Sequence, residues 1–190
     1  MEIKQVPSPN FITGRGGFKP EIIVLHIMDG TLAGTDSWFS TPTSKVSSHY
    51  GVGLKGEIHQ YVQDLDQAWT QGYHQGATFK LHKPGINPNA YCLSIEYEGQ
   101  NLANAPETQI NASVGLIRSL ASYWKIPIDR DHIIGHYEID PIRKPHCPAT
   151  DKTIIDKIIK LAQNISVNTK GVLLKRIDEL RQLVEQSIIN

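Results

Sequence analysis

The sequence is poor in cysteine, has no excess of charge of either sign and contains no long apolar run. Two cysteines in 190 residues are too few for a disulfide framework. The 19 basic and 19 acidic side chains give a formal net charge of +0, whereas a nucleic-acid binder needs a surplus of Lys and Arg. No stretch approaches the roughly 18 consecutive apolar residues of a membrane span. The first residues also lack the basic start and apolar run of a signal peptide, so we expect synthesis in the cytoplasm.

The composition is that of a folded globular chain, with 39% hydrophobic and 20% charged residues. A single core usually serves about 100–200 residues, so the length predicts one domain and a short extension. We place the domain at residues 1–168, with its core at about 20–163, and a C-terminal amphipathic helix at 169–190. The apolar stripe within residues 172–188 suits packing onto the domain or self-association through a second copy.

Hydrophobic patterning predicts strands that are mixed with helices along the chain. An apolar run suggests a doubly buried strand, alternation suggests a half-buried strand, and 3–4 residue spacing suggests a helix. The strands are expected at 21–26, 91–97 and 132–136 with a hairpin over 49–62, and the helices at 110–124 and 154–162. This mixture indicates an α/β domain built on one sheet, in which residues 1–19 form an irregular lead-in.

Side-chain caps are also expected at two helix starts. Thr35 and Asp36 can cap a short helix that stops near Pro42, and Thr150 or Asp151 can cap the helix over 154–162.

Eight histidines are the most conspicuous feature of the composition. His26 and His136 each end a predicted strand, and Cys147 follows in a loop between prolines. Two imidazoles and one thiolate are a suitable ligand set for catalytic zinc, because three protein ligands leave a fourth position open. His146 is adjacent to Cys147 and has the same access, so spacing leaves the third ligand open between them.

Two charged residues accompany these candidate ligands. Glu96 is an isolated charge on an apolar strand, where it suits a general base that takes a proton from water. Lys144 is near the ligands in sequence and suits stabilisation of the oxyanion that forms when a carbonyl is attacked. A rival interpretation is a cysteine peptidase that uses Cys92 or Cys147 with a histidine, although a mid-strand Cys92 is poorly exposed for that role.

Taken together and in order, the motifs resemble the zinc-dependent N-acetylmuramoyl-L-alanine amidases related to peptidoglycan recognition proteins, a family that includes many phage lysins. The matching segments are IIVLHIMDG, VSSHYGVGLKGEIHQYV, WTQGYHQGAT, AYCLSIEYEG and IIGHYEIDPIRKPHCPA. They cover roughly residues 20–160, which is nearly all of the predicted domain.

The resemblance implies a central mixed β-sheet flanked by helices, a bound Zn²⁺ and a peptidoglycan substrate. It implies hydrolysis of the amide between N-acetylmuramic acid and L-alanine. By position, the zinc ligands are His26, His136 and Cys147, and the catalytic carboxylate and lysine are Glu96 and Lys144. The substrate groove is expected to include His49, His74 and His146.

One departure from the family pattern lies in the loop before the third ligand. Family members commonly have one residue between the lysine and this ligand, whereas Pro145 and His146 separate Lys144 from Cys147 here. Some relatives bind peptidoglycan without cutting it, which makes a non-catalytic binding module the second alternative. Both a phage-type lysin and a cytoplasmic recycling enzyme fit the sequence.

Overall fold

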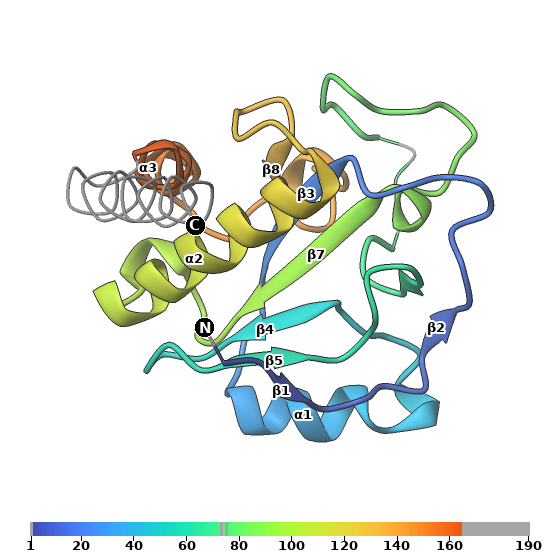
Figure 1. Ribbon diagram of the computed structural model, residues 1–190, viewed down its shortest axis with the longest axis horizontal. Helices are drawn as coiled ribbons and strands as arrows, with labels where there is room; N and C mark the ends of the chain where they lie inside the picture. Colours follow the sequence, from blue (N-terminus) through green and yellow to red (C-terminus); the bar gives the residue numbers. More distant parts are fainter. Residues whose placement is uncertain (1, 73, 75, 165–190) are drawn as a thin grey trace, which may run out of the picture.

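Six strands form one mixed sheet, and its order places the parallel strands at the centre. The computed structural model describes residues 2–72, 74 and 76–164. The order of the strands is β1-β5-β4-β7-β3-β8 (Figure 1). Their bounds are β1 Lys4–Gln5, β3 Ile22–Ile27, β4 Tyr50–Val52, β5 Ile58–Gln60, β7 Cys92–Tyr97 and β8 Ile133–Gly135. The α/β fold built on a mixed sheet is therefore confirmed.

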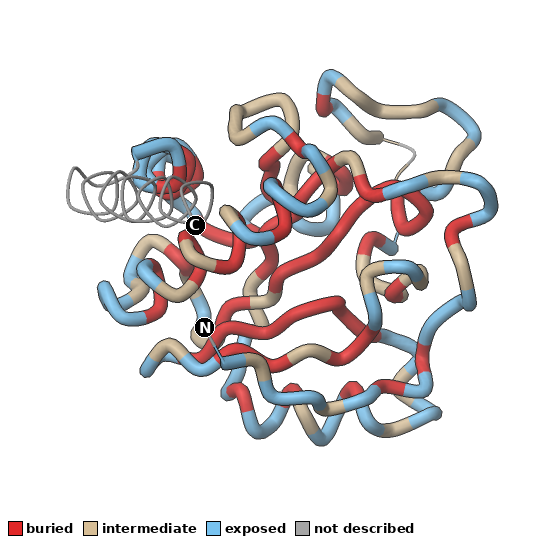
Figure 2. The backbone as a smooth tube through the Cα atoms, in the orientation of Figure 1, coloured by how far each residue is buried: buried red, intermediate tan, exposed pale blue. Residues whose placement is uncertain are grey.

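Apolar residues on both faces explain why β3 and β7 take the middle of the sheet. Ile22, Ile23, Val24 and Leu25 are all 0% exposed, as expected for a parallel strand covered on both sides. Figure 2 shows both strands buried along most of their length. The helices α2 (Glu107–Trp124) and α3 (Thr153–Gln163) contribute to the larger core on one face.

A hairpin within this sheet, a short helix beside it and a second small sheet complete the description. The predicted hairpin over 49–62 is confirmed as the antiparallel pair of β4 and β5. Helix α1 (Leu32–Phe39) is joined to β5 by a hydrogen bond of 2.8 Å between Asp36 Oδ1 and His59 Nδ1. A separate two-stranded sheet consists of β2 (Phe11–Ile12) and β6 (Gln67–Ala68).

Three local predictions are corrected by the structure. The lead-in is not wholly irregular, because β1 pairs with β5 and β2 pairs with β6. Thr31, rather than Thr35 or Asp36, caps α1, since its side chain accepts a hydrogen bond from Gly34 N–H. At α3 the N-cap position is Lys152, although the Asp151 carboxylate still accepts from the Thr153 amide at 3.0 Å.

The predicted helix over 169–190 and the self-association segment 172–188 lie outside the described residues. In the part of the chain that is described, no helix combines the length and apolar character that crossing a membrane requires.

Candidate active site and metal centre

Strand register brings Glu96 and His26 together, although 70 positions separate them in the sequence. They are paired residues on the neighbouring parallel strands β7 and β3, close to the carboxyl ends of both. Side chains at paired positions lie on the same face of a sheet, and this edge is where α/β folds commonly bind ligands. His26 Nδ1 lies 3.9 Å from Glu96 Oε1.

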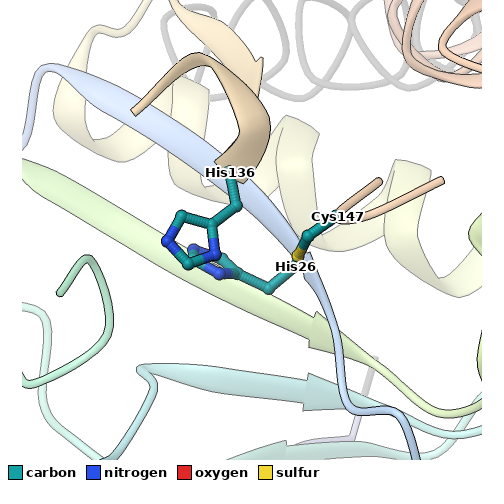
Figure 3. Close-up of side chains that lie close together, drawn as sticks. All are labelled: His26, His136 and Cys147. Carbon is teal, nitrogen blue, oxygen red and sulfur yellow. The ribbon is translucent and has the colours of Figure 1, made fainter. Parts of the chain in front are cut away.

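His136 and Cys147 complete the cluster from the other side of β3. Leu25 pairs with Gly135, so His136 follows directly at the end of β8 and begins the 3₁₀ turn η4 (His136–Glu138). The loop that carries Cys147 is attached there, because Tyr137 N–H donates to the Cys147 carbonyl at 2.9 Å. Potential ligand atoms of His26, His136 and Cys147 all lie within 4.8 Å of one another (Figure 3).

Burial keeps both imidazoles of this cluster neutral, which is the form that binds metals. His26 is 2% exposed and His136 is 6% exposed. Burial, with His136 and Lys144 nearby, holds the pKa of His26 well below its ordinary value. Burial also lowers the pKa of His136 to about 4, against the opposing effect of its hydrogen bond to the Gln71 carbonyl.

The pKa values of the Cys147 thiol and the Glu96 carboxyl group are raised rather than lowered. Burial, and then the nearby Glu96, raises the pKa of Cys147 to about 12, and the Ile27 N–H at 3.4 Å from Sγ acts against this. Burial likewise raises the pKa of Glu96 to about 7, with Lys144 opposing it. Glu96 Oε2 is buried and has no hydrogen-bond partner among the described residues.

A cavity of about 410 Å³ opens over the cluster, and Lys144 is in its lining. Lys144 is exposed. The turn before it is held by the buried carboxylate of Asp140, which accepts hydrogen bonds from the backbone and the side chain of Arg143, both at 3.0 Å. His146 is also exposed, but it lies outside both the ligand cluster and the cavity lining. The geometry therefore favours Cys147 over His146 as the third ligand.

Sequence reasoning missed several residues of the cavity wall. Trp38, Trp69, Gln71 and Arg143 all line it, and Trp38 is 56% exposed at its rim. Trp69 and Gln71 lie in the WTQG segment, which resembles the family but does not mark either side chain as functional. Trp38 belongs to a short helix, where one exposed aromatic residue has no distinctive sequence pattern.

The structure places neither His49 nor His74, both expected in the substrate groove, in the lining of this cavity. His49 is 1% exposed, and its ring lies between Arg15 and Ser94, 2.9 Å from a polar atom of each. His74 instead lies near His82, with their ring centroids 6.4 Å apart.

The buried His49 predicts a loss of stability in acid. Burial, and then Arg15, lowers the pKa of His49 to about 3, so the folded state resists a proton that the unfolded chain accepts below about 6.5. Between these values the free energy of unfolding should fall with decreasing pH, by up to about 1.4 kcal/mol per pH unit from this group. Denaturant titrations of the metal-free protein at several pH values, with and without His49→Gln, measure it. An equally steep dependence in the variant would contradict the prediction.

Comparison with known proteins agrees with this arrangement. The family model described as N-acetylmuramoyl-L-alanine amidase matches residues 16–150, which include every member of the cluster. The chain belongs to this amidase family. An amidase relative, N-acetylmuramoyl-L-alanine amidase A of Achromobacter lyticus, is 32% identical over 124 residues. That match covers 59% of this chain and 62% of the relative, so the chain spans less than two thirds of that relative's length.

Other amidases match over more of their length. The 1,6-anhydro-N-acetylmuramyl-L-alanine amidase AmpD of Salmonella typhimurium is 28% identical over 163 residues, which cover 76% of this chain and 82% of the relative. A solved structure of a selenomethionine AmpD derivative superposes with a TM-score of 0.65 at 22% identity, over 83% of this chain and 94% of the other. A mutant endolysin from Bacillus subtilis superposes with a TM-score of 0.60 at 20% identity, over 87% and 99%. These two superpositions establish the amidase fold.

Proposed function

We propose that this chain is a zinc-dependent amidase that hydrolyses the bond between N-acetylmuramic acid and the L-alanine of the peptidoglycan stem peptide. The observation that carries the proposal is the row of Glu96, His26 and His136 across three strand ends, with Cys147 beside it, under an open cavity. The family assignment supplies the substrate class, since the matching relatives are named for this amide.

The donor set fits zinc. Two neutral imidazoles and a thiol lie within 4.8 Å of one another, and three protein ligands are typical of a catalytic site that keeps one position open. The Ile27 N–H directed at Sγ opposes the rise that burial causes in the pKa of Cys147, and a hydrogen bond of this kind favours the thiolate that a metal needs. A zinc ion bound by these residues would supply Lewis acidity, which lowers the pKa of water and polarises a carbonyl.

Glu96 is assigned the proton transfers. Its unpartnered Oε2 accepts a proton from the attacking water, and the same oxygen returns it to the departing amine as the C–N bond breaks. Its pKa of about 7 suits both directions, because a group that titrates near neutral pH can accept and release protons at similar cost.

Lys144 is assigned to the oxyanion of the lactyl carbonyl. Lys144 lines the cavity, and its positive charge opposes charging of both proposed ligand histidines, so it is near enough to stabilise a negative charge that develops there. The exposed ring of Trp38 at the rim offers an apolar surface for the sugar or peptide on either side of the scissile bond.

The burial of the two thiols disfavours the cysteine-peptidase alternative. Such an enzyme needs a thiolate with a depressed pKa. Burial raises the pKa of Cys92, and burial with Glu96 raises that of Cys147. The binding-module alternative is disfavoured because both histidines, the thiol, the carboxylate and the lysine are all present at the cavity.

The proposed activity can be tested on purified cell walls and on soluble muropeptides. We expect release of peptides with new L-alanine amino termini, detected by mass spectrometry, and loss of this activity after chelation. Adding zinc back to the chelated protein should restore the hydrolytic activity. Binding to cell walls without cleavage would support the binding module, and inhibition by thiol alkylation but not by chelation would support the peptidase.

The Lys144→Ala variant should still bind zinc but should hydrolyse the substrate more slowly. Removing one oxyanion donor typically costs on the order of 100–1000-fold in kcat, and we expect a loss of this size. The measurement is hydrolysis at saturating muropeptide, together with zinc content by elemental analysis. Lys157→Ala, on the exposed face of α3, is the matched control and should leave the rate unchanged. A native rate for Lys144→Ala would remove the role assigned here.

A further inference from the structure

Gln71 lies against both histidines of the proposed metal centre. It is 1% exposed and belongs to the cavity wall. Its main-chain oxygen lies 3.2 Å from His136 Nε2. Because a carbonyl oxygen only accepts hydrogen bonds, this contact places the ring proton on Nε2 and leaves His136 Nδ1 as the atom with a free lone pair.

The second histidine lies beside the first, with the ring centroids of His26 and His136 4.3 Å apart, and Gln71 and His26 both line the cavity. Gln71 Oε1 and His26 Nε2 are both buried and have no hydrogen-bond partner among the described residues. The other nitrogen, His26 Nδ1, faces Glu96 at 3.9 Å. The cluster therefore includes one buried acceptor without a donor, and one buried ring nitrogen, not directed at the carboxylate, without an acceptor.

The backbone at Gln71 is fixed by contacts that do not involve either histidine. The Asn89 side-chain oxygen accepts from Gln71 N–H at 3.0 Å, and Asn89 is itself buried. Thr70 Oγ1 donates to the Ser47 carbonyl at 2.7 Å. The backbone of Gln71 is thus held in place by the surrounding loops, and its main-chain oxygen is positioned independently of any ligand.

We propose that Gln71 is a positioning residue that holds both histidine ligands. Its carbonyl orients His136, and its side-chain Oε1 accepts from His26 Nε2 once a metal engages Nδ1. Hydrogen bonds of this kind fix the tautomer and the orientation of a ligating ring and increase its basicity. Here one residue would supply them to both rings. The inference rests on the proposed zinc site.

The test measures zinc affinity by competition with a chromophoric chelator. Gln71→Leu removes Oε1 but keeps the main-chain carbonyl, and we expect the zinc Kd to rise about tenfold or more. Gln71→Glu restores an acceptor at the same place, and its Kd should return to the wild-type value or below it. Gln109→Leu is the matched control, since Gln109 is also buried with an unpartnered Oε1 but donates to Val52 and Glu98 carbonyls instead. Its zinc Kd should be unchanged.

The outcomes separate this inference from the metal site itself. A wild-type protein that binds no zinc would overturn both. Wild-type binding at one zinc per chain with an unchanged Kd in folded Gln71→Leu would overturn the role of Gln71 alone. If Gln71→Leu does not fold, Gln71→Asn replaces it. Its side chain ends in the same amide but is one methylene shorter, so the zinc Kd should still rise. A wild-type Kd in Gln71→Asn would then overturn the inference.

Discussion

Glu96→Gln should abolish most of the hydrolytic activity while the protein keeps its zinc. The amide has the shape of the carboxylate but accepts no proton, and losing a general base typically costs about 100- to 10,000-fold. We expect a loss of about 1000-fold, because the Glu96 carboxyl group has a buried and unpartnered oxygen and lies beside the proposed ligand His26. Rates of muropeptide hydrolysis and zinc content by elemental analysis measure the two effects separately.

Glu98→Gln is the matched control for this experiment. Glu98 lies just past the end of the same strand, but its carboxylate accepts from Leu54 N–H at 2.9 Å, outside the cavity lining. We expect it to keep nearly full activity. A Glu96→Gln variant within tenfold of the native rate would assign proton transfer to another group.

Cys147→Ser should lose the metal. A hydroxyl group is a far poorer zinc ligand than a thiolate, and even partners outside the first ligand shell are worth about 10–100-fold in affinity. We therefore expect the zinc Kd to rise by more than about 100-fold, with activity falling in parallel. Elemental analysis after dialysis, and chelator competition on the same samples, provide the measurement.

Two companion variants make the Cys147 result specific. Cys92→Ala removes the other free thiol, which is buried in β7 away from the ligand cluster, and should retain zinc. His146→Ala should also retain zinc, because this exposed ring lies outside the cluster. Retention of zinc by Cys147→Ser together with its loss in His146→Ala would reverse the assignment between these neighbours.

The main elements of the fold could be predicted because their patterns are strong. The apolar run that became β3 and the helical spacing that became α2 were located to within a few residues. The two-residue strands β1 and β2 were missed, because Lys4 and Gln5 have no apolar periodicity and form a strand only through pairing with β5. Local sequence does not encode a partner that is more than 50 residues away.

The chemistry of the site could be predicted better than its walls. Strand-end histidines, an isolated carboxylate and a proline-flanked cysteine are recognisable residue types in recognisable places, and they converge. The burial of His49 could not be predicted from the residues around it, because the ring contacts Arg15, which reaches it from the lead-in. Gln71 could not be predicted because an amide has no distinctive spacing, and only its contact with the His136 ring and its unpartnered, buried Oε1 reveal it.

The row of chemical groups across β7, β3 and β8 would tie binding of the proposed zinc ion to completion of the fold. Three parallel strands have to be in register before Glu96, His26 and His136 become neighbours, so an unfolded chain offers no preformed site. The free energy of zinc binding would then add to the free energy of unfolding, by about 2.7 kcal/mol at a zinc concentration 100 times the Kd. A chelator would therefore lower the melting temperature as well as the activity, and thermal stability would report on occupancy of the site.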